Sequence, residues 1–120
     1  MYRLMIVYDS NIILNRIQRL YNSDTFSLVA TATNGDDAVE KFKLYKPEVI
    51  TMDLTMPQMD GLECIEKLVE LDTGVRILVV SALSDKATGI KALELGASGF
   101  LCKPFSEEEL VEALDELVSD

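Results

Sequence analysis

The chain has 120 residues, enough for one domain with its own hydrophobic core and too few for two. Its 48% hydrophobic and 27% charged residues exclude a disordered chain, and the net charge of −10 argues against direct nucleic-acid binding. The first apolar run is too short for a membrane span, and two cysteines without a CxxC pair favour a reduced, cytoplasmic setting.

Five short apolar runs alternate with segments of helical spacing. The runs cover residues 4–7, 28–32, 49–52, 77–80 and 99–102, and their nearly continuous aliphatic character is typical of strands buried on both faces. A segment with apolar residues three or four positions apart follows each run, up to Leu117 and Val118 at the end. The alternation predicts an α/β fold: a five-stranded, doubly wound parallel sheet with five helices on its two faces.

Polar residues mark the ends of the predicted helices. Asn34 is placed to cap the second helix, and Ser106 with Glu109 forms a capping box at the start of the last. Gly96 stands where a left-handed residue would end the fourth helix. These signals agree with the apolar pattern and leave no internal linker or repeat.

Chemically capable side chains gather at the predicted carboxyl ends of the strands. Asp9 follows the first strand, Asp53 the third, Ser81 the fourth and Lys103 the fifth. In an open parallel sheet these ends meet at one edge. Two carboxylates brought together repel, and a divalent cation held by hard oxygen ligands, Mg²⁺ above all, relieves that repulsion. A lysine and a hydroxyl beside them suit a phosphoryl group arriving on Asp53.

Each of these residues also has an ordinary structural interpretation. Asp9 is a competent helix cap, Asp53 a competent turn residue, and Ser81 a competent cap or turn residue. Lys103, before a proline, is acceptable as a surface lysine. The joint placement of all four at one sheet edge favours the functional interpretation.

The same residues resemble the receiver domain of two-component response regulators over the whole chain. The matching stretches are residues 4–9, 53–57 with Asp60 and Gly61, 79–82 and 100–105. The resemblance implies a flavodoxin-like sheet of order 2-1-3-4-5 and one receiver domain over residues 1–120, which is either complete or cut from a longer regulator with a C-terminal effector domain. It also implies a signalling domain that assists only its own phosphorylation and dephosphorylation.

The resemblance assigns a role to each site residue. Asp53 is the phosphoacceptor, and Asp9, Asp53 and the backbone carbonyl of Thr55 are the Mg²⁺ ligands. Lys103 pairs with the phosphoryl group, Ser81 moves onto it, and the ring of Phe100 turns inward in response. The implied phosphodonor is a sensor histidine kinase or a histidine phosphotransfer protein, and no membrane contact is implied.

One position departs from the family pattern. Two adjacent acids usually follow the first strand, whereas this chain has Tyr8 before Asp9. With one carboxylate fewer, the attraction for Mg²⁺ is expected to weaken. The alternatives are that the Tyr8 hydroxyl orders the same metal-bound water, or that phosphorylation is lost altogether.

The signal is expected to leave through the fourth helix, the fifth strand and the fifth helix, with a homodimer through that surface as one outcome. Gly89 inside the fourth helix either weakens it as a two-state element or permits close packing. The acids of the last helix, Glu107, Glu108, Glu109 and Glu112, either select a partner or form a solvated surface.

Three other functions compete with the phosphoacceptor. An aspartyl phosphatase usually has a second acid two residues after the aspartate, where this chain has Thr55. A flavin-binding domain needs a Ser/Thr/Gly-rich phosphate loop, whereas residues 8–11 are acidic and lack glycine. The remaining rival is an interaction module that works without phosphorylation.

Overall fold

The computed structural model describes residues 2–8, 26–54, 61–82, 86–103 and 105–118. The strands are β1 (Tyr2–Val7), β2 (Phe26–Ala32), β3 (Val49–Asp53), β4 (Arg76–Ala82) and β5 (Gly99–Lys103). The helices are α2 (Gly35–Tyr45), α3 (Gly61–Leu71), α4 (Lys86–Glu94) and α5 (Glu107–Val118). The first expected helix falls on residues outside the described ones.

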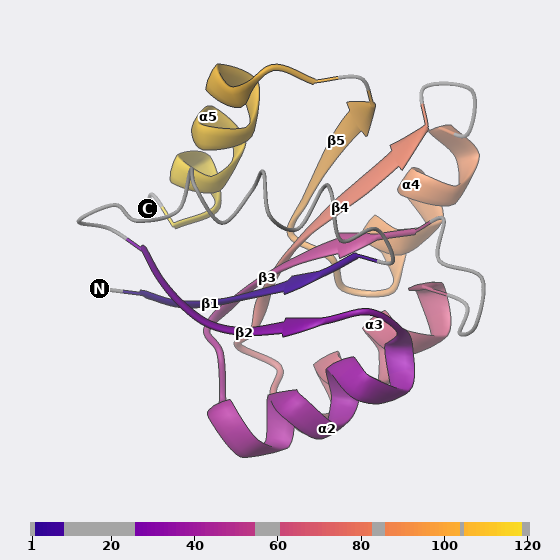
Figure 1. Ribbon diagram of the computed structural model, residues 1–120. Helices are drawn as coiled ribbons and strands as arrows, with labels where there is room; N and C mark the ends of the chain where they lie inside the picture. The colour runs from indigo at the N-terminus through magenta and orange to yellow at the C-terminus, as the bar shows by residue number, and fades with distance from the viewer. Residues whose placement is uncertain (1, 9–25, 55–60, 83–85, 104, 119–120) are drawn as a thin grey trace.

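All five strands pair in parallel in the order β2-β1-β3-β4-β5 (Figure 1). This confirms the doubly wound sheet and its predicted order. The chain starts in β1 near the middle, adds β2 on one side, and then crosses to build β3, β4 and β5 on the other. The order therefore reverses beside β1 and β3, which is where open α/β sheets place their functional sites.

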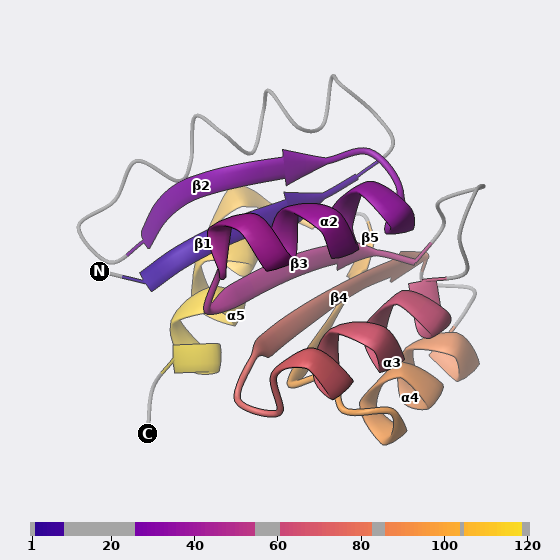
Figure 2. The ribbon, with the colours of Figure 1, turned by 90° about the horizontal axis from the view of Figure 1, so that it is seen from below.

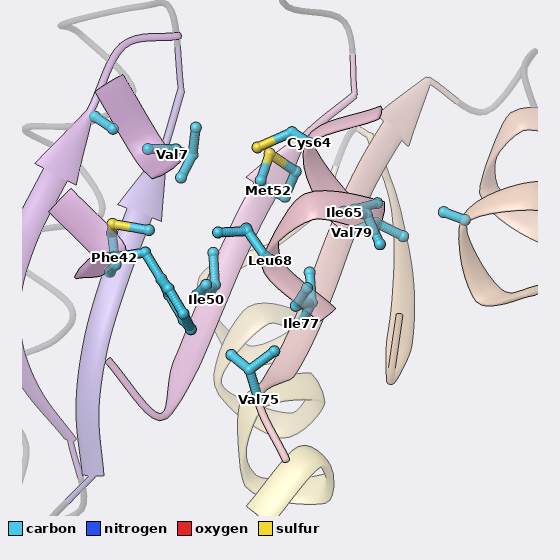
Figure 3. Close-up of a cluster of buried hydrophobic side chains, with 14 residues drawn as sticks. Val7, Phe42, Ile50, Met52, Cys64, Ile65, Leu68, Val75, Ile77 and Val79 are labelled. Atoms are coloured by element: carbon cyan, nitrogen blue, oxygen red, sulfur yellow. The ribbon is translucent and has the colours of Figure 1, made fainter. Parts of the chain in front are cut away.

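Side chains alternate between the two faces of the sheet and build two hydrophobic clusters. One face packs against α2, α3 and α4, and Figure 3 shows Phe42, Cys64 and Leu68 of the helices meeting Ile50 and Met52 of β3. The opposite face packs against α5, which lies behind the sheet in Figure 2. Because both faces are covered, the central strands read as continuous apolar runs in the sequence.

The predicted caps are present. The side chain of Asn34 accepts a hydrogen bond from the Asp37 N–H at 2.8 Å at the start of α2. At the start of α5, Ser106 Oγ accepts from the Glu109 N–H at 3.1 Å, while Glu109 Oε1 accepts from the Ser106 N–H at 3.3 Å. Gly96 has φ +120° just after α4, in a conformation that side chains rarely adopt. Local sequence chemistry therefore sets these helix ends.

The periodicity of α4 was misleading at two positions. Ile90 and Leu93 stand three positions apart, a spacing that predicts a side facing the core, yet these residues are 58% and 41% exposed. Among the α4 residues whose burial is described, Gly89 and Ala92 are buried. A helix of nine residues with small buried side chains carries too weak a periodic signal to show which side faces inward. Among the described helices, none is long and apolar enough to cross a membrane.

Candidate functional site at the carboxyl edge of the sheet

The candidate site is built on the strand ends, which parallel pairing brings to one edge of the sheet (Figure 1). Asp53 is the last residue of β3 and lies opposite Val80 of β4, and the next backbone N–H, of Leu54, donates to the Val80 carbonyl at 3.0 Å. Ser81 follows Val80 and lies opposite Cys102 of β5. The backbone of Lys103 is one step further along the same edge, opposite Ala82.

The Asp53 carboxylate is almost fully enclosed, with 1% of the residue exposed. Its strand is buried throughout, and the residues before it face either hydrophobic cluster in turn. A negative charge in such a place is costly unless donors or cations stabilise it. The burial of Asp53 at this edge of the sheet therefore favours a chemical role over that of an ordinary turn residue.

Tyr8 lies beside Asp53 and is also buried. Its backbone N–H donates to the Ala32 carbonyl at 3.0 Å, and its side chain continues the row of Leu4 and Ile6 in the cluster beneath α5. The Tyr8 hydroxyl is enclosed and has no hydrogen-bond partner among the described residues. Burial first, and the charge of Asp53 second, raise the pKa of the Tyr8 phenol above its ordinary value. Tyr8 thus brings a neutral O–H to the site in place of a carboxylate.

Ser81 and Phe100 lie on the opposite face of the sheet, toward α4. Phe100 pairs with Val79 in the sheet register and packs against the cluster that includes Val79 and Ala92. Ser81 is fully buried two residues beyond Val79, and side chains two apart on a strand point to the same face. Ser81 and Phe100 are therefore neighbours on the side covered by α4.

The ring of Phe100 lies directly on the backbone of Gly89 in α4. A Cβ atom built on Gly89 would be 1.9 Å from Phe100 Cε2 and 2.4 Å from Phe100 Cδ2. The space that a side chain at position 89 would need is filled by the ring. Of the two interpretations of Gly89, the structure supports close packing. This contact connects α4 to β5, the strand that ends at Lys103.

The predicted site residues are only partly covered by the structure. Asp53, Ser81 and Phe100 are described, and the strand pairing brings the first two to adjacent strand ends. Asp9 and Thr55 lie outside the described residues, as does the side chain of Lys103. Within the described part of the chain, no three carboxylate or thiol side chains gather to hold a metal.

Two features of the site were missed by sequence reasoning. The burial of Tyr8 in the core beneath α5 could have been found from its place in the alternation Leu4, Ile6, Tyr8. The contact between Gly89 and Phe100 had only a weak signal, a glycine inside a helix. Its partner is a strand residue eleven positions later, and no local pattern identifies it.

The chain is similar to a known protein family and to known proteins over most of its length. The profile of the response regulator receiver domain matches residues 4–115. The chemotaxis protein CheY of Thermotoga maritima is 36% identical over 115 residues, which cover 96% of each chain. CheY of Bacillus subtilis is 35% identical and covers 98% of each chain. The chain therefore spans nearly the whole length of these relatives.

Solved structures give the same result for the fold. A LuxR-family response regulator from Aurantimonas superimposes with a TM-score of 0.90 at 30% identity, over 98% of this chain and 84% of that one. The CheX–CheY–BeF3–Mg complex from Borrelia burgdorferi superimposes with a TM-score of 0.91 at 28% identity, over 99% of this chain and 90% of that one. The second was solved with a beryllium fluoride and a magnesium ion.

Proposed function

The chain belongs to the response regulator receiver domain family, and we propose on that basis that it accepts a phosphoryl group on Asp53 and passes the change to a partner surface. The observation that carries the proposal is the buried carboxylate of Asp53 at the carboxyl edge of a central strand. Residues 1–120 are proposed to form one receiver domain that works in the cytoplasm. The proposed donor is a sensor histidine kinase or a histidine phosphotransfer protein.

In the proposed step, an oxygen of the Asp53 carboxylate attacks the phosphorus of a phosphohistidine. The new O–P bond forms as the P–N bond breaks, and the electron pair of that bond stays on the imidazole nitrogen. The product is an acyl phosphate on Asp53, which hydrolysis returns to the carboxylate and inorganic phosphate. Lys103 is proposed to pair with the added charge and Ser81 to donate a hydrogen bond to a phosphoryl oxygen. No turnover of outside substrates is proposed.

Mg²⁺ is the proposed cofactor, held by the carboxylates of Asp9 and Asp53 and the backbone carbonyl of Thr55. The donors that the structure describes fit this ion, because the Asp53 carboxylate and the Tyr8 hydroxyl are hard oxygen groups without competing sulfur or imidazole. When bound, Mg²⁺ would supply positive charge between the carboxylate and the incoming phosphoryl group. The magnesium ion of the Borrelia CheY complex supports this choice.

The proposed signal runs from Ser81 to Phe100. When Ser81 moves toward the phosphoryl group, it vacates space on the face toward α4, and the ring of Phe100 can move into it. The ring now lies on Gly89, so this movement would loosen the contact between β5 and α4. The outer surface of α4, β5 and α5 is therefore the proposed output, for an effector domain, a partner protein or a second copy.

Intact-mass measurement after incubation with acetyl phosphate and Mg²⁺ tests the proposal. The parent chain is expected to gain one phosphoryl group that needs Mg²⁺ and is lost at alkaline pH. Asp53→Asn, which keeps the size of the side chain, should gain none. Ser81→Ala should still be phosphorylated and should lack the conformational response of the Phe100 ring, read by NMR.

The Tyr8 phenol beside Asp53 favours one second candidate, an interaction module that works without phosphorylation. A phenol in place of a carboxylate leaves the site with less charge to attract Mg²⁺. If neither acetyl phosphate nor beryllofluoride forms an adduct on Asp53 at saturating Mg²⁺, the phosphoacceptor proposal is wrong and this candidate replaces it.

A further inference from the structure

A groove runs between α2 and α3, away from the candidate site. The two helices pack side by side on one face of the sheet (Figure 2). α2 ends beside the start of β1, where Arg3 Nε donates to the Lys46 carbonyl at 3.0 Å. α3 ends at Leu71, shortly before β4 begins at Arg76. These helix ends therefore lie toward the amino edge of the sheet, opposite the edge that carries Asp53.

Two neighbouring pockets make up this groove. One has a volume of about 330 Å³ and the other of about 350 Å³. Lys43 of α2 and Leu71 of α3 line both pockets, so the two are continuous. Phe42 adds an apolar wall to the first and Val39 to the second. We call the two pockets together the α2–α3 groove.

The length of the groove suits a short helical segment. Val39, Lys43 and Lys46 follow one side of α2 at intervals of four and three positions, which corresponds to about 10 Å along the helix axis. About two turns of a partner helix cover this length. Two apolar side chains one turn apart, about 5–6 Å from each other, could enter the two pockets. Leu71, which is 48% exposed, offers apolar surface for them to bury.

The groove is basic in a strongly acidic chain. Residues 41–47 contain three lysines and no acid, although the net charge of the chain is −10. Lys43 and Lys46 line the groove on the α2 side, and neither forms an ion pair among the described residues. Lys67 lines it on the α3 side, 3.8 Å from Glu63. That pair is about half exposed and contributes little, so Lys67 can pair with a partner instead.

Two acids in the lining do not cancel the three lysines. Asp72 Oδ1 accepts a hydrogen bond from the Gly74 N–H at 2.9 Å, so this carboxylate is engaged in its own turn. Glu70 is exposed on α3. The lining therefore has a net positive charge, and carboxylates are the complementary groups.

Lys46 occupies a backbone position that favours glycine. It has φ 50°, in the left-handed region, and its N–H donates to the Phe42 carbonyl at 2.9 Å where α2 ends. Glycine adopts this conformation at lower cost and is common at this point of a helix. A cation near the end of a helix offsets the helix dipole, but Lys43 in the last turn already does so. A contact in the groove gives the lysine at position 46 a reason that helix geometry does not.

We propose that the α2–α3 groove binds an acidic amphipathic helix of a partner protein, independently of phosphorylation at Asp53. Two apolar side chains of that helix enter the pockets, and its carboxylates pair with Lys43, Lys46 and Lys67. Because the groove lies toward the opposite edge of the sheet, the partner can stay bound while the state of Asp53 changes. This inference goes beyond the proposed function and does not require it.

A second copy of the chain fits the groove less well. Its acidic helix is α5, where Val111 is the exposed large apolar residue among those described. One valine would leave one of the two pockets empty. Two chains that each carry a net charge of −10 also repel each other.

Three synthetic peptides test the chemistry of the occupant on the full 120-residue chain. The first is a helix with two leucines one turn apart and glutamates on its polar side, the second scrambles this sequence, and the third replaces the leucines by serine. Fluorescence anisotropy is expected to show the first binding about tenfold tighter than either control. Raising the salt concentration should weaken it. Beryllofluoride with Mg²⁺ should change its affinity by less than about twofold.

Matched charge variants locate the binding site. Lys43→Glu reverses an exposed charge in the groove, whereas Lys91→Glu makes the same change at an exposed position of α4. The first should weaken the acidic peptide about fivefold or more, and the second by less than about twofold.

Lys46→Gly separates binding from folding. The substitution relieves the left-handed lysine, so the midpoint of urea unfolding should rise. Binding of the acidic peptide should nevertheless weaken about threefold, because one cation is lost. A variant that is more stable and binds less tightly cannot owe its weaker binding to unfolding.

Five results would overturn the proposal. Equal binding of the first peptide and either control would remove the assigned chemistry, and equal loss in Lys43→Glu and Lys91→Glu would remove the assigned place. Unchanged binding by Lys46→Gly would mean that this lysine has no part in it. A dimer in sedimentation that Lys43→Glu dissociates would make a second copy the occupant. A larger than twofold effect of beryllofluoride would tie the groove to Asp53.

Discussion

At the scale of single residues, the site combines a buried acid with a buried phenol. Asp53 and Tyr8 lie at the ends of neighbouring strands, and the charge of Asp53 contributes to the raised pKa of Tyr8. A neutral phenol adds no negative charge to the site, so it relieves the repulsion that a third carboxylate would add. The same exchange removes a charge that would attract Mg²⁺. Tyr8 is therefore expected to favour folding of the metal-free chain and to weaken the binding of Mg²⁺.

Tyr8→Asp is expected to increase Mg²⁺ affinity by about tenfold, because a restored carboxylate adds Coulombic attraction at short distance. Isothermal titration calorimetry of the folded chain measures the change directly. Tyr8→Asn is the matched control, since it has the size of aspartate without the charge and should not gain affinity. Equal Mg²⁺ affinities for the parent and Tyr8→Asp would show that the phenol supports metal binding as well as a carboxylate does.

Among the described residues, Cys64 is the other buried group with a shifted pKa. Burial raises the pKa of its thiol from 9.0 to about 12. By smaller amounts, Lys67 lowers this pKa and Asp36 and Glu63 raise it. The sulfur lies 3.8 Å from the Gly35 carbonyl and can donate to it only as a thiol. Because the folded pKa is the higher one, this contribution to stability is complete below pH 9.0 and is lost as the pH rises toward 12.

The parent chain should therefore lose stability faster than Cys64→Ala between pH 9.0 and about 12, in urea unfolding at a series of pH values. Cys64→Ala lowers the stability at neutral pH through a cavity, so the slopes are compared and not the absolute values. Parallel slopes would mean that the thiol ionises as easily in the folded chain as in the unfolded one.

At the scale of elements, α4 and β5 meet through a close contact between Gly89 and the ring of Phe100. A glycine in the middle of a helix costs about 1 kcal/mol relative to alanine, so an uncompensated Gly89 would be a defect. The Phe100 ring fills the space that a side chain at position 89 would occupy, and its van der Waals contacts with the helix backbone offset this cost. The ring can move only if its contact with α4 is lost, so a movement of Phe100 in β5 would affect the packing of α4.

Gly89→Ala is expected to lower the free energy of unfolding by about 1–2 kcal/mol, because overpacking against the Phe100 ring outweighs the better helix propensity of alanine. Urea denaturation measures the change. In the Phe100→Ala background the same substitution should become neutral or stabilising, since the clash is gone. A stabilising Gly89→Ala in the parent chain would mean that the ring is not held against the helix.

At the scale of the whole molecule, the chain has a net charge of −10 spread over an α/β core with both sheet faces covered. Self-repulsion of this charge opposes the compact state, and most of it is on the surface, where salt screens it. The acids are not evenly placed, since α5 alone carries six. This excess charge is expected to lower the stability of the folded chain most at low ionic strength.

Sodium chloride at 0.5 M should raise the unfolding free energy over that at 0.02 M by about 1 kcal/mol, through screening of the excess negative charge. The measurement is urea unfolding at the two salt concentrations. A double variant with Glu66→Lys and Glu112→Lys is less negative and should gain less from salt. An equal gain in both chains would point to general salting effects on apolar surface.

Sequence by itself determined the order of elements, the helix ends and the edge of the sheet where Asp53, Ser81 and Lys103 lie. These follow from local rules: apolar runs make buried strands, Asn34 and Ser106 satisfy the first N–H groups of a helix, and parallel strands end at one edge. The roles of those residues came from the family resemblance, and Asp9 and Thr55 stay predictions.

Only the tertiary structure decided which side of α4 is buried, how Tyr8 fits beside Asp53, and what fills the space above Gly89. Each depends on a neighbour from a distant part of the chain, such as Phe100 for Gly89. Periodicity predicts that a helix has an apolar side. Whether Gly89 or Ile90 is buried depends on the surface of the sheet against which α4 packs. Packing is a property of pairs of surfaces, and a local sequence pattern describes one surface at a time.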